Sequence, residues 1–234
     1  MADPLVLRAL ELKTHTLLRL RDAQDLRGEG PLPAWVERSL QRASWVVVRR
    51  ALGRNGLIPI GVRGEFREQR FAAWVAEDAI LDYVAPGELV RRRAWEGCDR
   101  ARLEAIPALA VLDELVAILD AHGLSGVWGP GGSVGFELAS GAATATPDSD
   151  LDLVIAIGGL ESSFSRDARE LWRALAGLRV RVDALLETSH GAVVLSEYVR
   201  AHDERGAFVL RTTSGPRLIH ATFDLAATPE PVAL

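Results

Sequence analysis

Residues 127–157 read VWGPGGSVGFELASGAATATPDSDLDLVIAI, and this stretch decides the predicted fold. A short apolar segment containing Trp128 leads into a turn rich in glycine. Gly131 and Gly132 leave the backbone free to adopt unusual dihedral angles, and Ser133 can cap a helix that ends near Gly141. The free N–H groups at the start of such a helix, together with the Ser133 hydroxyl, would suit a phosphate group.

Two acidic residues follow this helix, where an apolar strand is expected to begin. Asp150 and Asp152 lie two residues apart, so a strand places both carboxylates on one face and Leu151 and Leu153 on the other. At roughly 6 Å the two charges repel by about 0.7 kcal/mol in water and about 3 kcal/mol at an effective dielectric constant of 20. Such a pair in a cleft favours a cation, and carboxylates beside a phosphate cradle favour Mg²⁺ or Mn²⁺. Phosphoryl or nucleotidyl transfer is the predicted chemistry.

The order of these parts is more specific than any one of them. Glycine turns precede many helices, and Asp-x-Asp often marks a solvated strand face. A strand, Gly-Gly-Ser, a short helix and then Asp-x-Asp together resemble the nucleotidyltransferase superfamily related to DNA polymerase β, which has a third acid on a later strand. Asp183 in the segment RVRVDALLE (179–187) matches that acid, because its neighbours Val182 and Ala184 are expected to face the core. Glu187 lies on the same face as Asp183 and is the alternative.

Composition restricts the class of protein. The 234 residues are 48% hydrophobic and 25% charged, which is typical of a soluble globular chain of one large domain or two small ones. A net charge of -5 and a sequence pI of about 5.6 disfavour a nucleic-acid substrate, because the chain lacks a global basic field. Lys13 is the only lysine, so a phosphate clamp would be built from arginine.

Cysteine use and the N-terminal sequence predict a cytoplasmic location. Cys98 is the only cysteine, so no internal disulfide can form and a reducing compartment is the simplest location. Charged residues interrupt the first segment where a signal peptide would need an apolar core. Uncharged runs stay shorter than the eighteen or so residues that a membrane span needs, so we expect no membrane segment.

The N-terminal half is predicted to be a smaller α/β domain. We expect strands at 14–20, 44–52 and 57–64, the last two forming a hairpin, and helices at 34–43 and 67–84. Pro86 and Gly87 would end the second helix. Because charged residues crowd 87–102, we place the domain limits at 1–95 and 96–234.

The C-terminal half is predicted to be a nucleotidyltransferase-like α+β domain, in which helices flank a mixed sheet. Helices are expected at 106–119 and 165–178, and strands at 179–187, 192–200 and 207–212. The five histidines pair with no cysteine, and no Gly-x-Ser-x-Gly segment accompanies a serine, so a hydrolytic triad has little support. His190 follows Asp183 along the chain and is the one histidine that could approach the acids.

A closer resemblance runs through most of the chain, from about Thr14 to Ile219. It is carried by WVVVRRA (45–51), IPIGVRGEFREQRFAAWV (58–75), GPGGSVGFELASG (129–141), SDLDLVI (149–155), VRVDALLE (180–187), HGAVVLSEY (190–198) and LRTTSGPRLI (210–219). This order of segments resembles the phosphoribosyl-dephospho-CoA transferases, also called malonate decarboxylase holo-acyl-carrier-protein synthases. The resemblance implies transfer from 2'-(5''-triphosphoribosyl)-3'-dephospho-CoA to a serine of the acyl carrier protein of malonate decarboxylase, with release of pyrophosphate.

The resemblance also implies roles for particular residues. Asp150 and Asp152 match the acid pair of the family, Gly132 and Ser133 match its phosphate turn, and Asp183 is a weaker match. With Mg²⁺ or Mn²⁺, the three carboxylates would serve an in-line displacement, in which Asp183 could accept the serine proton.

Two arginines of the N-terminal half fall in an arginine-containing segment of the same family. Arg63 and Arg70 would bind phosphate oxygens of the donor, or they are ordinary surface arginines. Two other functions stay open at this point. One is an ATP-using nucleotidyltransferase that modifies a protein or a small molecule, and the other is an inactive module that only binds a carrier protein.

Overall fold

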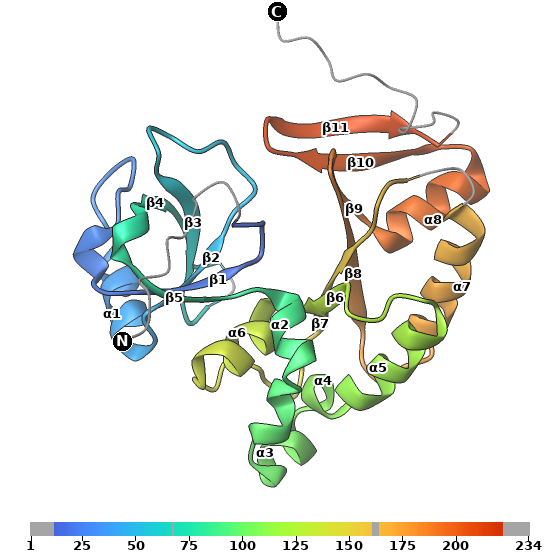
Figure 1. Cartoon of the computed structure of the whole chain (residues 1–234), viewed down its shortest axis with the longest axis horizontal. Coiled ribbons are helices and arrows are strands. Elements are labelled where there is room, and N and C mark those ends of the chain that lie inside the picture. The colour runs from blue at the N-terminus through green and yellow to red at the C-terminus, as the bar shows by residue number, and fades with distance from the viewer. Residues whose placement is uncertain (1–11, 67, 161–163, 222–234) are drawn as a thin grey trace, which may run out of the picture.

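Two β-sheets form the framework of the protein in a computed structural model that describes residues 12–66, 68–160 and 164–221 (Figure 1). The strands are β1 (Leu17–Leu20), β2 (Trp45–Val48), β3 (Ile58–Arg63), β4 (Arg70–Val75), β5 (Ile80–Val84), β6 (Trp128–Pro130), β7 (Leu151–Ala156), β8 (Val182–Thr188), β9 (Gly191–Val194), β10 (Ala207–Thr212) and β11 (Gly215–His220). The α-helices are α1 (Ala34–Arg42), α2 (Pro86–Arg91), α3 (Arg100–Ala105), α4 (Pro107–Ala110), α5 (Leu112–Ala121), α6 (Gly132–Ser140), α7 (Phe164–Ala176) and α8 (Leu195–Glu204). The α+β class predicted from the sequence is confirmed.

The first sheet has the strand order β4-β3-β2-β1-β5, and each neighbouring pair is antiparallel. Alternation in β3 buries Ile58, Ile60 and Val62, while Val36 and Leu40 of α1 are buried in the same cluster. The helix expected at 34–43 and the β2–β3 hairpin are therefore confirmed.

The helix predicted at 67–84 is wrong. Within that range the structure has β4, a short 3-10 turn (Glu77–Ala79) and β5. β4 pairs with β3 along its whole length, from Arg63 opposite Arg70 to Ile58 opposite Val75. The apolar residues recur at a spacing that also fits a helix, and the pairing with the preceding strand decides between helix and strand.

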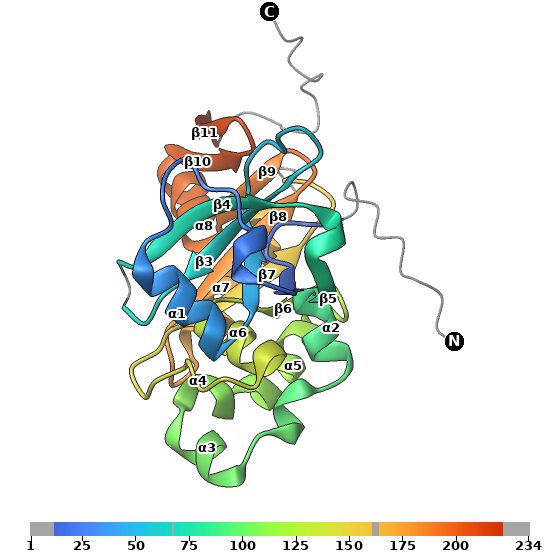
Figure 2. The same ribbon diagram turned by 90° about the vertical axis from the view of Figure 1, so that its left-hand side faces the viewer.

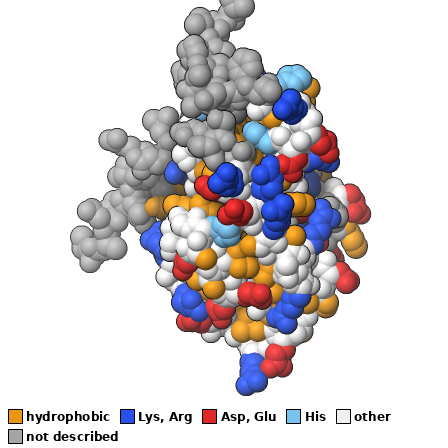
Figure 3. Space-filling view, turned by 90° about the vertical axis from the view of Figure 1, so that its right-hand side faces the viewer, with side chains coloured by type: hydrophobic (Ala, Val, Ile, Leu, Met, Phe, Trp, Pro, Cys, Tyr) orange, Lys and Arg blue, Asp and Glu red, His pale blue; other side chains and the backbone are white. Residues whose placement is uncertain are grey.

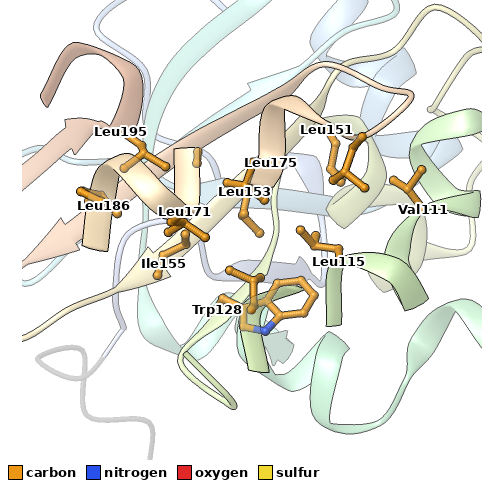
Figure 4. Close-up of a cluster of buried hydrophobic side chains, with 14 of the residues drawn as sticks. Val111, Leu115, Trp128, Leu151, Leu153, Ile155, Leu171, Leu175, Leu186 and Leu195 are labelled. Carbon is orange, nitrogen blue, oxygen red and sulfur yellow. The ribbon is translucent and has the colours of Figure 1, made fainter. Parts of the chain in front are cut away.

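The second sheet has the order β11-β10-β9-β8-β7-β6, and only the β7–β8 pair is parallel. Helix α7 makes the crossover between these two strands. Figure 4 shows Leu151, Leu153 and Ile155 of β7 in one buried cluster with Leu171 and Leu175 of α7. Because Leu151, Leu153 and Ile155 are buried in this core, Asp152 between them points to the other face of the sheet.

Three predicted elements at the C-terminal side need correction. The strand expected at 192–200 stops at Val194, where α8 begins and buries Leu195, Tyr198 and Val199 at helical spacing. The helix expected at 106–119 is divided into α4 and α5. Strand β11 was missed, although it pairs along its whole length with β10.

The two sheets lie side by side, as the views in Figures 1 and 2 agree. Helix α2 leads from the first sheet and packs on β6, where a Cβ atom on Gly129 would lie 2.1 Å from the Pro86 carbonyl. The charge-dense segment around 87–102 is folded, and its Trp95 is buried in the core of the second sheet. The domain limits of 1–95 and 96–234 stay a prediction.

Two features of the structure bear on membrane and nucleic-acid partners. None of the helices in the described part of the chain is long and apolar enough to cross a membrane. On the face shown in Figure 3, basic, acidic and hydrophobic side chains are interspersed.

Candidate active site

A cavity of about 530 Å³ lies between the two sheets and brings together residues from both halves of the chain. Five of the seven predicted site residues line it: Arg63 of β3, Arg70 of β4, Gly132 of α6, Asp152 of β7 and Asp183 of β8. Asp150 and Ser133 are not among its lining residues. The cavity therefore joins the predicted phosphate turn, two of the three predicted acids and both predicted arginines.

The glycine turn contacts the acid strand through its backbone. Gly131 donates its N–H to the carbonyl oxygen of Asp152 at 2.8 Å, and Gly132 has a φ of +55°. A Cβ atom on Gly132 would lie only 1.7 Å from Oδ2 of Asp152. Glycine is therefore required here both for the left-handed backbone and for the space that the carboxylate occupies.

Ser133 does not cap α6, so this part of the prediction is wrong. The N-cap residue is Gly131, and it makes no side-chain capping bond. Ser133 lies inside the first turn, buried, with its Oγ 3.4 Å from the Oγ of Ser149. The predicted end of the helix is confirmed, because Gly141 is its left-handed C-cap.

Asp152 and Asp183 are direct neighbours across the parallel β7–β8 pair. Residues in register on adjacent strands project from the same face of the sheet, so both carboxylates reach the cavity. Arg181 contacts the outer side of this group, with its Nη2 3.1 Å from Oδ1 of Asp183 and its Nη1 3.9 Å from Oδ2 of Asp150. Sequence reasoning missed Arg181, although its position two residues before Asp183 places it on the same strand face.

Burial is the main cause that raises the pKa of Asp152. The charge of Asp183 raises this pKa further and that of Asp150 adds to it, while Arg63 and His15 act in the opposite direction. The Asp152 side chain lines the cavity and is exposed to solvent there. The burial that raises its pKa therefore comes from the protein atoms around the cavity, and water still reaches the carboxylate. A cation beside these carboxylates would relieve the repulsion between them.

The predicted metal site is therefore only partly assembled. In residues 12–66, 68–160 and 164–221, no group of three or more His, Cys, Asp and Glu side chains is placed to hold a metal ion. Asp152 and Asp183 alone still fit a divalent cation, because Mg²⁺ usually binds through one or two carboxylates and completes its shell with water and substrate phosphates. The three-carboxylate set with Asp150 stays a prediction.

Glu187, the alternative third acid, lies away from the cavity lining. It lies four positions after Asp183, which corresponds to about 13 Å along a strand. Its Oε1 accepts a hydrogen bond of 3.0 Å from Nε2 of His15 and pairs with Arg50. Burial by itself would raise the pKa of Glu187, but the hydrogen bonds from His15 and Arg50 outweigh it and lower this pKa. Glu187 thus fastens the N-terminal half to β8.

The arginine wall of the cavity comes from the first sheet. Arg63 and Arg70 are cross-strand partners in the β3–β4 pair, and Arg49 lies beside them with its Nε donating to the Ile60 carbonyl at 2.9 Å. Three cationic side chains on one wall face Asp152 and Asp183 on the other. This arrangement suits a polyphosphate, whose oxygens can bind the arginines directly.

A buried ion pair holds the connector that leads to the acids. Glu137 of α6 accepts from Nε and Nη2 of Arg102 at 2.7 and 2.8 Å, and from the N–H groups of Thr144 and Ala145 at 2.8 Å each. Burial alone would raise the pKa of Glu137, but these bonds lower it. Nothing in the local sequence pattern indicated this pair.

His190, the histidine that the sequence placed nearest to the acids, is exposed, hydrogen-bonds Ser189 and does not line the cavity.

Comparison with known proteins agrees with the resemblance found in the sequence. The chain matches the sequence model described as phosphoribosyl-dephospho-CoA transferase MdcG C-terminal domain over residues 93–222, and the corresponding N-terminal domain over residues 13–86. No solved structure matches the chain.

Several curated relatives cover most of the chain. A phosphoribosyl-dephospho-CoA transferase of Pseudomonas syringae pv. tomato is 40% identical over 195 residues, which are 83% of this chain and 86% of the relative. A protein of the same name from Pseudomonas aeruginosa is 38% identical over 196 residues, which are 83% of this chain and 86% of the relative. Another from Klebsiella pneumoniae is 36% identical over 208 residues, which are 88% of this chain and 93% of the relative. The chain therefore belongs to the phosphoribosyl-dephospho-CoA transferase family.

Proposed function

We propose that this protein transfers the phosphoribosyl-dephospho-CoA group from 2'-(5''-triphosphoribosyl)-3'-dephospho-CoA to a serine of the acyl carrier protein of malonate decarboxylase. The observation that carries this proposal is the meeting of the Gly132 turn, Asp152, Asp183 and the Arg63–Arg70 pair in one cavity. Membership of the family supports the same reaction class. The strand-turn-helix arrangement before the Asp152 strand supports a nucleotidyltransferase-like catalytic half.

The proposed reaction is an in-line displacement at the phosphorus next to the ribose. The serine oxygen forms a new bond to this phosphorus, and the bond to the second phosphate breaks, so pyrophosphate leaves. Asp183 accepts the proton of the serine hydroxyl in this proposal. Arg63 and Arg70 bind oxygens of the two phosphates that leave as pyrophosphate, and this stabilises the negative charge that develops on the leaving group.

We further propose that Asp152 and Asp183 hold Mg²⁺ or Mn²⁺ against the donor phosphates, with Asp150 as a third carboxylate. The metal, when bound, would neutralise charge on the phosphates during transfer. The N–H groups of Gly132 and of the rest of the first turn of α6 bind a phosphate oxygen from the other side. We place this reaction in the cytoplasm, as the single cysteine predicts.

The intact mass of the carrier protein tests the reaction. The protein is incubated with Mg²⁺, the triphosphoribosyl donor and the carrier protein, and a carrier variant with alanine in place of the acceptor serine is the control. We expect a mass gain equal to the phosphoribosyl-dephospho-CoA group on the natural carrier only, together with one pyrophosphate for each group transferred. A gain of this size on the alanine carrier would contradict the serine acceptor.

Two other outcomes would replace the proposal. A gain of a nucleotide from ATP, without use of the triphosphoribosyl donor, would identify an ATP-using nucleotidyltransferase. Binding of the carrier protein with no mass change from either donor would identify an inactive binding module.

A further inference from the structure

A second cavity, of about 410 Å³, lies next to the first and shares Asp183 with it. Its walls come from the end of α7, the beginning of β8 and the beginning of α8. The first cavity holds the arginine wall and the glycine turn, whereas the second holds neither. Asp183 therefore stands where a group in one cavity could meet a group in the other.

The second cavity exists because β8 is longer at its start than its partner β9. Pairing between the two strands covers Leu185–Thr188 of β8, since α8 begins at Leu195 and turns the chain away. In the described chain, residues 182–184 of β8 thus have a strand neighbour, β7, on one side only. The space left on the open side is the cavity.

The side chains around this cavity fit an acidic protein segment. Arg179 and Arg181 line it, and the Arg181 side chain is 70% exposed. In the described part of the chain, Arg179 has no ion-pair partner. Trp172 lies at the same cavity with 42% of its surface exposed, which offers an apolar contact. Arg181 contacts Asp183 and Asp150, so Arg179 is the cation of this cavity that is left to meet an acidic partner. Such a local charge is needed because the chain carries a net charge of -5 and as a whole repels an acidic partner.

We propose that this second cavity receives the acceptor, an acidic segment of the carrier protein that presents its serine to Asp183. The inference rests on the proposed function for the identity of the acceptor. Donor and acceptor would then approach Asp183 from different cavities. This separation keeps the acidic segment away from the donor phosphates, whose charge would repel it.

Arg179→Glu tests the proposal by direct binding. The dissociation constant of a fluorescently labelled carrier protein is measured by anisotropy with the wild-type chain, with Arg179→Glu and with Arg166→Glu. Arg166 is an exposed arginine near the start of α7 and outside the second cavity, so it controls for the change in net charge. We expect Arg179→Glu to weaken carrier binding by about tenfold or more, and Arg166→Glu to change it by less than about twofold.

A charge exchange and a kinetic comparison sharpen the test. An Asp→Arg or Glu→Arg change in the carrier protein, beside its acceptor serine, should restore binding to Arg179→Glu. The KM of Arg179→Glu for the triphosphoribosyl donor should stay within about twofold of the wild-type value. Equal carrier binding by Arg179→Glu and the wild type, or no carrier binding by either, would overturn the proposal. Because binding is measured without transfer, absence of any mass gain would refute the proposed function and leave this comparison valid.

Discussion

Gly132 and Asp152 approach each other so closely that a Cβ atom on the glycine would lie 1.7 Å from Oδ2 of the aspartate. The contact joins the first turn of α6 to β7, which the backbone bond from Gly131 to the Asp152 carbonyl also ties together. The N–H groups of the helix start and a carboxylate thus share one small space. A phosphate bound at the turn would lie beside the carboxylate that we expect to hold its cation.

Gly132→Ala is expected to abolish transfer while the chain still folds. The methyl group must displace the Asp152 carboxylate, and the positive φ adds a cost of about 1–2 kcal/mol. Gly141→Ala is the matched control, because Gly141 has a φ of +73° and open space around its Cβ position. In urea unfolding Gly141→Ala should lose the stability that its positive φ costs and Gly132→Ala at least as much, and only Gly132→Ala should lose transfer by about 100-fold or more. Normal transfer by Gly132→Ala would contradict the assignment of this turn.

Asp152→Asn should lose transfer without losing stability at pH 7. Because the folded pKa of Asp152 is raised above its ordinary value of 3.8, the folded chain binds this proton more tightly than the unfolded chain. The free energy of unfolding therefore falls as pH rises through the raised pKa, and asparagine removes that penalty. Urea unfolding should find the variant at least as stable as the wild type at pH 7, with any advantage gone by pH 3.5.

Asp148→Asn provides the control for this variant, because it removes one exposed charge from the same segment. It should retain transfer. If Asp152→Asn proved clearly less stable than the wild type at pH 7, the carboxylate would be a stabilising group and not a strained one.

Glu187→Gln should weaken the attachment of the N-terminal half. The lowered pKa of Glu187 means that its ionised form contributes stability above the ordinary value of 4.5, and this contribution is lost as pH falls through the lowered pKa. We expect a loss of about 1–3 kcal/mol at pH 7 that shrinks below pH 4. Glu29→Gln, which alters an exposed pair with Arg54 at 3.8 Å, should change stability by less than about 0.5 kcal/mol. Equal effects of the two variants would show that the His15–Glu187 contact is not formed in solution.

Glu137→Gln should be among the more destabilising single changes in the chain. The Glu137 side chain is 7% exposed and the Arg102 side chain 29%, so the guanidinium would keep some contact with water but lose its partner. We expect a loss of about 3 kcal/mol, near the lower end for a broken buried pair. Glu104→Gln alters the exposed pair with Arg100 and should change stability by less than about 1 kcal/mol. Chemical unfolding at pH 7 measures both, and a small effect of Glu137→Gln would show that the pair does not hold the connector.

Removal of divalent cations should stop transfer but not carrier binding. Asp152 and Asp183 together with a triphosphate gather negative charge that the arginine wall neutralises only in part. After treatment with EDTA and desalting, transfer should disappear and return with Mg²⁺ or Mn²⁺, whereas anisotropy with the labelled carrier protein should not change. Persistent transfer in EDTA would refute the metal requirement.

The motif region and the family could be predicted from the sequence. Gly-Gly-Ser before a short helix, and Asp-x-Asp at the start of an apolar strand, depend on local spacing that a sequence records directly. The same holds for α1, the β2–β3 hairpin, α7 and the end of α6 at Gly141. Local patterns failed where pairing with the preceding strand selected the structure, as for β4, which pairs with β3, and for β11, which pairs with β10.

Only the tertiary structure decided which residues meet. Asp152 and Asp183 become neighbours through the parallel β7–β8 pair, and Arg63 joins them because the first sheet packs beside the second. The pairing of His15 with Glu187 spans 172 positions of the chain, so no local pattern could indicate it. Contacts of this kind depend on how the two sheets pack, and that packing is set by the summed burial of many apolar side chains and not by any one motif.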